Sequence, residues 1–225
     1  MILLFSDMNY DREWAAGLLA ETFSYMQTAA VLPLVHEEGW ASDAVMHGDL
    51  LAEEENLYRL QRPLRAYGMK PENIRILNQN GLEPEIFARV LQHSDVLVLS
   101  ARSASEACRI LEDRGLDSLI RRYHGLLVGI GAGAEALLDT VEDSWYGVER
   151  EGLGVLSGFH LMMNYSEEPE QLAQIIRYLE TGDESVVIVP AQGGVLFDYG
   201  NIELLGNAFI ADGRDLDELY SLYGG

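Results

Sequence analysis

The sequence of 225 residues predicts a single α/β domain, a three-layer sandwich with helices on both sides of a mainly parallel sheet. Five short apolar runs alternate with amphipathic segments, a pattern typical of parallel strands joined by right-handed helical crossovers. Residues 96–99 read Val-Leu-Val-Leu, which suits a strand buried on both faces. Internal repeats, low-complexity segments and linkers are not recognisable in the sequence, so residues 1–225 are expected to form one domain.

The first part of the chain supplies the predicted parallel sheet. Strands are expected at residues 2–5, 29–35, 74–77, 95–100 and 126–130. Helices are expected at residues 11–23, 50–67, 83–92, 104–112 and 116–123, where apolar residues recur three or four positions apart. Pro63 predicts a bend in the second helix. Residues 36–49, rich in charge and glycine, are expected to form a loop.

The pattern changes after residue 150. Extended segments are expected at residues 152–156, 159–165 and 186–189, and helices at residues 171–180 and 216–223. Residues 195–197 and 202–205 flank the sequence Asp-Tyr-Gly-Asn, which is a hairpin signal. This hairpin indicates an antiparallel edge on the same sheet rather than a second domain.

The composition limits the partners and the compartment. A formal charge of −22 opposes binding to nucleic acid or to an anionic membrane. Two interpretations of this charge remain: it keeps the protein soluble, or it attracts a cationic ligand or basic partner. A lone cysteine, Cys108, cannot form an internal disulfide. The N-terminal apolar run is too short for a signal peptide, and no later run reaches the length of a membrane span. These features predict a cytoplasmic protein.

The most informative segment is the turn after the fifth apolar run. Residues 127–136 read Leu-Val-Gly-Ile-Gly-Ala-Gly-Ala-Glu-Ala, a buried strand that passes through small residues directly into a helix. This is the context of the nucleophile elbow G-x-S-x-G, in which a strained turn exposes a serine and backbone N–H groups face the oxyanion. Gly131 stands at the serine position, and glycine adopts a positive φ without the usual penalty. The elbow geometry is therefore expected without its nucleophile.

Phosphate binding is a competing interpretation of the same turn. Gly129, Gly131 and Ala134 fit the dinucleotide fingerprint G-x-G-x-x-A. That fingerprint normally follows the first strand and precedes a strand that ends in an acidic residue. Here it lies in the middle of the chain with no such strand after it, so the elbow is the favoured interpretation. Nothing else in the sequence calls for a cofactor.

Three blocks of sequence resemble the peptidase E family of serine peptidases, which includes α-aspartyl dipeptidases and cyanophycinases. They are the strand, helix and Gly-Leu-Asp stretch of residues 95–120, the elbow, and residues 152–165, which read Gly-Leu-Gly-Val-Leu-Ser-Gly-Phe-His-Leu-Met-Met-Asn-Tyr. The order of segments matches over nearly the whole chain. The resemblance implies a fold similar to class I glutamine amidotransferases, with flavodoxin-like architecture.

The departures from the family pattern fall on its catalytic positions. Gly131 replaces the serine, and Asn164, beside the retained aromatic Tyr165, replaces the histidine. The G-G-N sequence on the oxyanion side reads Ala101-Arg102-Ser103, and the acidic position is Glu142 or Asp143. Because a triad needs its nucleophile, base and orienting acid together, the sequence predicts an inactive homologue with a binding or regulatory role.

A working hydrolase with a relocated nucleophile is the alternative. Ser103, Ser105 and Cys108 follow the strand next to the elbow, and His160 would be a shifted base. Ser103 is expected instead to cap the following helix, and Cys108 to pack inside it. His36, Glu37, His47 and Asp49 match no standard spacing of metal ligands, so no metal site is predicted.

The vestigial site is predicted to bind a small acidic peptide or another small anion. The candidate ligand-binding residues are Arg102, Ser103, Gly131, Ala132, His160, Asn164 and Tyr165. An arginine beside backbone N–H groups suits a carboxylate. In the opposing interpretation, Arg102 pairs with Glu106 or Asp143 and fills the pocket itself. A homodimer is left open.

Overall fold

The computed structural model describes residues 1–34, 50–143, 148–182 and 184–223. The predicted loop 36–49, with its two histidines and four acidic residues, lies outside the described residues. Within the described part, no helix is long and apolar enough to cross a membrane.

A seven-stranded sheet in the order β11-β10-β1-β5-β4-β2-β3 forms the centre of the molecule. The five strands predicted in the first part of the chain are β1 (Ile2–Phe5), β2 (Ala29–Leu34), β3 (Ile74–Ile76), β4 (Val96–Ala101) and β5 (Leu126–Gly131). They pair with one another in parallel, which confirms the predicted parallel sheet, and β5 lies at the centre of the seven strands. The predicted hairpin, β10 (Gly193–Asp198) and β11 (Asn201–Gly206), adds an antiparallel edge beside β1.

Helices cover both faces of this sheet because its strands are apolar on both sides. Leu97 and Leu99 of β4 enter one core, while Val96 and Val98 enter the other. The first core contains residues of α4 (Pro84–Leu91), α5 (Ala104–Asp113), α6 (Asp117–Arg121) and α7 (Ala132–Glu135). The second contains residues of α1 (Glu13–Ser24) and α3 (Leu50–Ala66). The fold class predicted from the sequence is confirmed.

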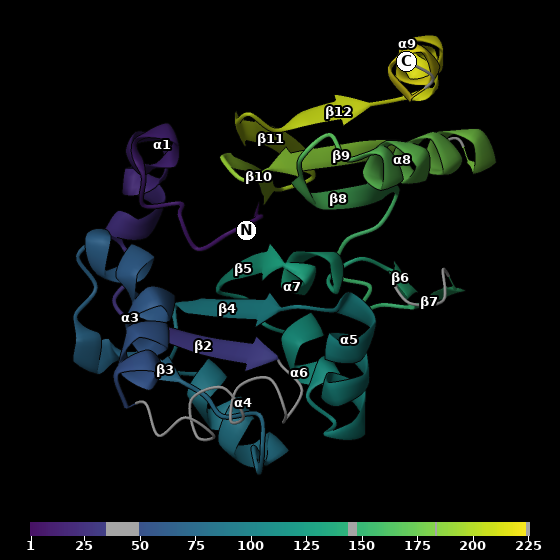
Figure 1. Ribbon diagram of the computed structural model, residues 1–225. Coiled ribbons are helices and arrows are strands. Elements are labelled where there is room, and N and C mark those ends of the chain that lie inside the picture. The colour runs from purple at the N-terminus through teal and green to yellow at the C-terminus, as the bar shows by residue number, and fades with distance from the viewer. Residues whose placement is uncertain (35–49, 144–147, 183, 224–225) are drawn as a thin grey trace.

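The last third of the chain builds a second, smaller sheet, which the sequence did not predict. Its strand order is β12-β9-β8, and α8 packs on it through a core of its own. The elements are β8 (Phe159–Tyr165), α8 (Pro169–Thr181), β9 (Ser185–Pro190), β12 (Phe209–Ala211) and α9 (Leu216–Tyr223). Figure 1 shows β8, β9, β12 and α8 together at the top, above β5 and α7.

Residues 152–156 correct one expectation. They do not form a strand, and only Leu156 makes an isolated bridge, with Leu138. Before them lies an unpredicted hairpin of β6 (Thr140–Asp143) and β7 (Val148–Glu151), whose charged residues give no apolar run to detect. The described residues also include the short 3₁₀ turns η1 (Pro71–Asn73) and η2 (Gly213–Asp215).

Candidate functional site

An open cleft of about 1230 Å³ lies beyond the carboxyl ends of the parallel strands. Residues that follow or end β1, β2, β4 and β5 form its floor, and residues of β8 and α8 form a wall. This is the position at which open α/β sheets bind ligands. Of the predicted ligand-binding residues, those lining the cleft are Arg102, Ser103, Gly131, Ala132, His160 and Asn164.

The turn at Gly131 has the predicted geometry of a nucleophile elbow. Gly131 has φ 55° and ψ −131°, at the point where β5 passes into α7. A Cβ on Gly129 would lie 2.6 Å from Ala134 Cα, and one on Gly133 would lie 2.6 Å from Leu99 O. The small residues are thus needed because α7 packs directly against β5 and β4. The predicted positive φ at Gly131 is confirmed.

Asn164 lies over the elbow. Its Nδ2 is 3.7 Å from the position that a Cβ on Gly131 would occupy. Asn164 itself has φ 54° and sits at a register shift between β8 and β9, between Met163 and Tyr165. The bulge turns the Asn164 side chain toward the cleft, where a base would have to stand to serve a nucleophile at position 131.

Three side chains hold this bulge in place. Ser6 Oγ accepts a hydrogen bond from Asn164 N at 2.8 Å and donates one to Val189 O at 2.5 Å. Gln171 Nε2 donates to Asn164 O at 3.1 Å. On the other side, Glu135 Oε1 accepts from Met163 N at 3.4 Å. The buried Ser6 therefore ties β8 to β9, a role that no local sequence pattern indicates.

Glu135 is a cleft carboxyl group with a raised pKa. It ends α7, four positions after Gly131, and lines the cleft. Burial raises the pKa of this carboxyl to about 7, and the hydrogen bond from Met163 N offsets only part of that effect. The sequence analysis did not select Glu135, because its burial depends on β8 packing over α7.

Glu142, one of the two candidates for the acidic position, bonds to α8. Glu142 accepts hydrogen bonds from Arg177 and Tyr178 at 2.6 Å and from Gln174 at 2.8 Å. In the described structure these bonds run to α8, and none joins Glu142 to Asn164. The backbone of Asp143 pairs with Val148, and its side chain lies outside the described residues.

Arg102, which follows β4, is exposed, whereas the candidate nucleophiles Ser103 and Cys108 have structural roles at α5. Arg102 is exposed at the cleft, and within the described residues it forms no ion pair. Ser103 Oγ caps α5 by accepting from Glu106 N at 3.3 Å, which confirms the predicted cap, and it lies 3.2 Å from Ser105 Oγ. Cys108 is fully buried, and burial raises the pKa of its thiol to about 11.

The two other predicted residues of β8, His160 and Tyr165, differ in their relation to the cleft. His160 stacks on Tyr178, with ring centroids 4.1 Å apart, and its Nε2 is 3.9 Å from a Glu184 oxygen. Tyr165 corrects an expectation, because it packs edge-on against Phe209 and is not among the described residues that line the cleft. The bulge at Asn164 accounts for this, since it shifts the register of Tyr165 against β9.

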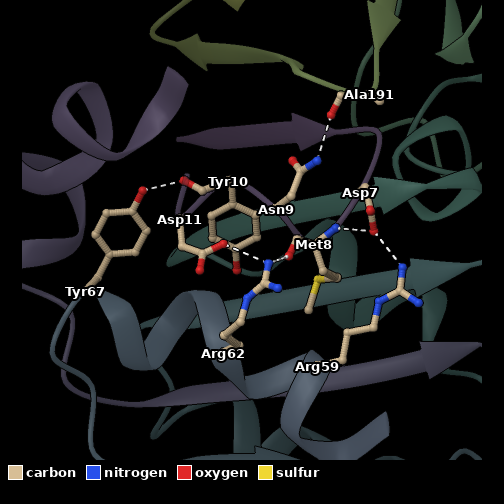
Figure 2. Close-up of polar contacts among 9 residues, drawn as sticks. All are labelled: Asp7, Met8, Asn9, Tyr10, Asp11, Arg59, Arg62, Tyr67 and Ala191. Carbon is tan, nitrogen blue, oxygen red and sulfur yellow. Dashed lines mark hydrogen bonds and ion pairs between the residues drawn. The ribbon is translucent and has the colours of Figure 1, made fainter. Parts of the chain in front are cut away.

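A loop after β1 forms a further wall that the sequence analysis missed. Arg59 of α3 pairs with Asp7 at 3.0 Å, and both residues line the cleft. Arg62 donates to Met8 O at 2.7 Å and to Asp11 at 2.9 Å, and both bonds are drawn in Figure 2. Two arginines one helical turn apart on α3 thus fix the loop after β1. The sequence analysis missed this contact because only the tertiary fold brings α3 next to the end of β1.

Metal ligands are not gathered in the described part of the chain. Among those residues, no group of three or more histidine, cysteine, aspartate or glutamate side chains is placed to hold an ion. His36, Glu37, His47 and Asp49 lie outside that part.

Solved structures with the same architecture identify the fold. A protein from Listeria monocytogenes EGD-e, named as a peptidase E, superposes with a TM-score of 0.67 at 14% identity, covering 90% of this chain and 96% of its own. A peptidase from an acI-B1 Actinobacterium gives the same score and identity, covering 94% and 90%. This chain has a peptidase E-like fold. No family model and no curated protein sequence matches it.

The peptidase E-like fold supplies the architecture around the site. It is the mainly parallel, flavodoxin-like sandwich of class I glutamine amidotransferases, as the sequence resemblance implied. At 14% identity the likeness concerns the backbone, so the chemistry of the cleft has to be argued from the side chains of this chain.

Proposed function

We propose that this chain is a catalytically inactive relative of the peptidase E-type serine peptidases, and that its cleft binds a small acidic peptide or another small anion. The observation that carries the proposal is the pair at the elbow: Gly131 in elbow geometry, with the Asn164 amide 3.7 Å from its missing Cβ. Glycine has no atom to attack a carbonyl, and a carboxamide cannot accept and return a proton at neutral pH.

A relocated nucleophile has less support. Ser103 is engaged as the cap of α5, and Cys108 is buried with a raised thiol pKa, which disfavours the reactive thiolate. His160 stacks on Tyr178 beside Glu184. The hydrolase alternative therefore requires Ser103 to leave its cap before it can act.

Retained binding is supported by the open cleft and by Arg102. Arg102 is exposed at the cleft, and Gly131 and Ala132 of the elbow line the same cleft. A guanidinium and N–H groups are the donors that carboxylates accept from. A small molecule is the proposed partner, because the −22 charge opposes nucleic acid. We also propose a cytoplasmic location, in line with the single, buried cysteine.

Catalytic inactivity is tested with purified protein and an active peptidase E measured side by side. A fluorophosphonate probe should leave this chain unlabelled, and aspartyl dipeptides and cyanophycin should remain uncleaved. Labelling or turnover that disappears in Ser103→Ala would replace the proposal with the relocated-nucleophile hydrolase.

Binding is tested by calorimetry with succinate, a dicarboxylate that carries no other functional group. Arg102→Gln should weaken binding roughly tenfold, since a charge-assisted hydrogen bond is lost. Arg122→Gln is the matched control, because Arg122 bonds to Ser118 on α6, away from the cleft. Equal effects of the two variants would mean that the anion is held by general electrostatics and not by the cleft.

A further inference from the structure

A second groove lies at the opposite end of the parallel strands from the candidate cleft. Its volume is about 930 Å³, and its lining includes Met1 before β1, Asp95 before β4 and Leu126 at the start of β5. Further apolar side chains of the lining are Met26, Leu91 and Leu119. The groove and the cleft share no described lining residue, so the groove is a separate feature of the molecule.

Tyr199 stands beside this groove in a conformation that tyrosine disfavours. Asp198 pairs with Asn201, so Tyr199 and Gly200 form the two-residue loop between β10 and β11. Tyr199 has φ 47° and Gly200 has φ 81°, and the commonest two-residue hairpin loop requires a positive φ at both positions. Asparagine and glycine meet this requirement easily, whereas tyrosine is strained there.

The exposure of Tyr199 also points to a partner. Tyr199 is 98% exposed, although it lines the groove. Neither the strain nor the exposure helps the hairpin to fold, so both indicate a role in binding. Tyrosine is enriched at protein interfaces, where it anchors one surface in a pocket of the other.

A protruding residue and a groove on one surface are self-complementary. In a twofold symmetric interface the same patch serves both copies, so each copy must offer what the other accepts. Here Tyr199 is the protruding residue and the groove next to it is the acceptor. A second copy of this chain therefore fits the surface without any further element.

The charges at the groove are complementary under the same symmetry. Arg122 and Asp198 both line it, and the exposed His124 adds a second basic group. Arg122 is exposed and forms no ion pair within the described residues. The carboxylate of Asp95 is already held by two backbone N–H groups before β2. Because copies with a charge of −22 repel one another in general, contact is favoured where basic groups gather beside an acidic one.

We propose that this groove is the interface of a twofold symmetric homodimer. Tyr199 of each copy enters the groove of the other, and Asp198 of each copy pairs with Arg122 of the other. The proposal concerns the end of the sheet opposite the cleft, so it does not depend on what the cleft binds.

Sedimentation velocity over a range of concentrations tests the anchor. The wild-type chain should form dimers, and Tyr199→Asn should raise the dissociation constant roughly thirtyfold or more, the loss typical of a buried aromatic anchor. The hairpin keeps its fold, because asparagine before Gly200 is the preferred pair for this loop. Tyr58→Asn is the control, since Tyr58 is an exposed tyrosine on α3 outside the groove. A wild-type chain that stays monomeric at millimolar concentration, or an equal dissociation constant in Tyr199→Asn, would overturn the proposal.

A mixing experiment tests whether the charged contact joins two copies. Arg122→Glu and Asp198→Arg each place like charges at both contacts of a homodimer, so each variant alone should be monomeric. Their equimolar mixture should form dimers, because a mixed dimer has one natural contact and one with the charges exchanged. Arg109→Glu, on α5 outside the groove, changes the net charge equally to Arg122→Glu and should leave the dimer intact. A mixture that remains monomeric, or variants that dimerise alone like the wild type, would show that Arg122 and Asp198 do not meet across the interface and would contradict the proposed dimer.

Discussion

A side chain at position 131 would meet little steric resistance, because the nearest atoms to a Cβ built there are 3.5 Å away or more. The resistance comes from the backbone, since φ 55° with ψ −131° is a region that glycine occupies far more easily than serine. Gly131→Ser should therefore fold, with a loss of about 1–3 kcal/mol in the free energy of unfolding. Urea denaturation measures this loss.

Gly213→Ser is the matched control for that substitution, because a Cβ at Gly213 enters open space and its φ is not positive. It should change the free energy of unfolding by less than about 0.5 kcal/mol. Gly131→Ser should also remain inactive toward aspartyl dipeptides, since Asn164 gives the new hydroxyl no base. Activity that appears only with the further change Asn164→His would support the assignment of position 164; activity of the single variant would contradict it.

Glu135 makes stability depend on pH. Its folded-state pKa of about 7 lies above that of an unfolded glutamate, so the folded state binds the proton more tightly. Stability contributed by the protonated carboxyl is complete below the unfolded pKa and is lost as pH rises through about 7. Glu135→Gln keeps an acceptor for Met163 N and removes the charge. The gain in the free energy of unfolding from Glu135→Gln should be about 1–3 kcal/mol larger at pH 8 than at pH 5.

The comparison is made by urea denaturation at both pH values. Glu170→Gln removes one negative charge from the exposed rim of the same cleft and controls for overall charge. The same gain at pH 5 and pH 8 for Glu135→Gln would mean that the ionisation of Glu135 is not the source of the effect.

At the scale of elements, the hydroxyl group of Ser6 is the buried link between the bulge of β8 and β9. Ser6 Oγ bridges Asn164 N and Val189 O in the interior. Ser6→Ala leaves the N–H of Asn164 without this acceptor, so the free energy of unfolding should fall by about 1–3 kcal/mol. Ser24→Ala removes an exposed hydroxyl that bonds to Glu21 O, and it should cost less than about 0.5 kcal/mol.

Hydrogen exchange gives a second, local measurement for Ser6→Ala. The amide of Asn164 should exchange faster in this variant, while amides in the middle of β5 keep their protection. Unchanged exchange at Asn164 would mean that the bulge is held by Gln171 and Glu135 without Ser6.

The elements that could be predicted from sequence are those whose signal is contiguous. The strand, glycine turn and helix around Gly131 lie within ten residues, so their geometry follows from local chemistry. The bulge at Asn164 could not be predicted, because it depends on Ser6, more than 150 positions earlier. The β6–β7 hairpin was missed since its residues are mostly polar, and β12 since three residues carry no recognisable period.

At the scale of the whole molecule, the alternation of apolar segments predicted the order of the layers. It did not predict that the strands divide between two sheets. β8 and β9 are apolar runs like β4 and β5, and nothing within them states which sheet they join. The sheet that β8 and β9 join is determined by α8, which buries one face of both strands in a separate core. The sequence located the candidate cleft because its floor is formed by the ends of the parallel strands. The walls formed by α3 and α8 were missed because these helices reach the cleft only through the tertiary fold.

The net charge of −22 acts on the molecule as a whole. Carboxylates that repel one another in the compact state move apart on unfolding, so this repulsion lowers stability. Salt shortens the range of that repulsion from about 30 Å at 0.01 M to about 10 Å at 0.1 M. The melting temperature should therefore rise as NaCl increases over this interval and then level off. KCl should act equally, because screening depends on ionic strength alone. Ion pairs such as Arg62–Asp11 and Arg177–Glu142 are weakened by the same salt, and a melting temperature that falls would show that these attractions outweigh the repulsion.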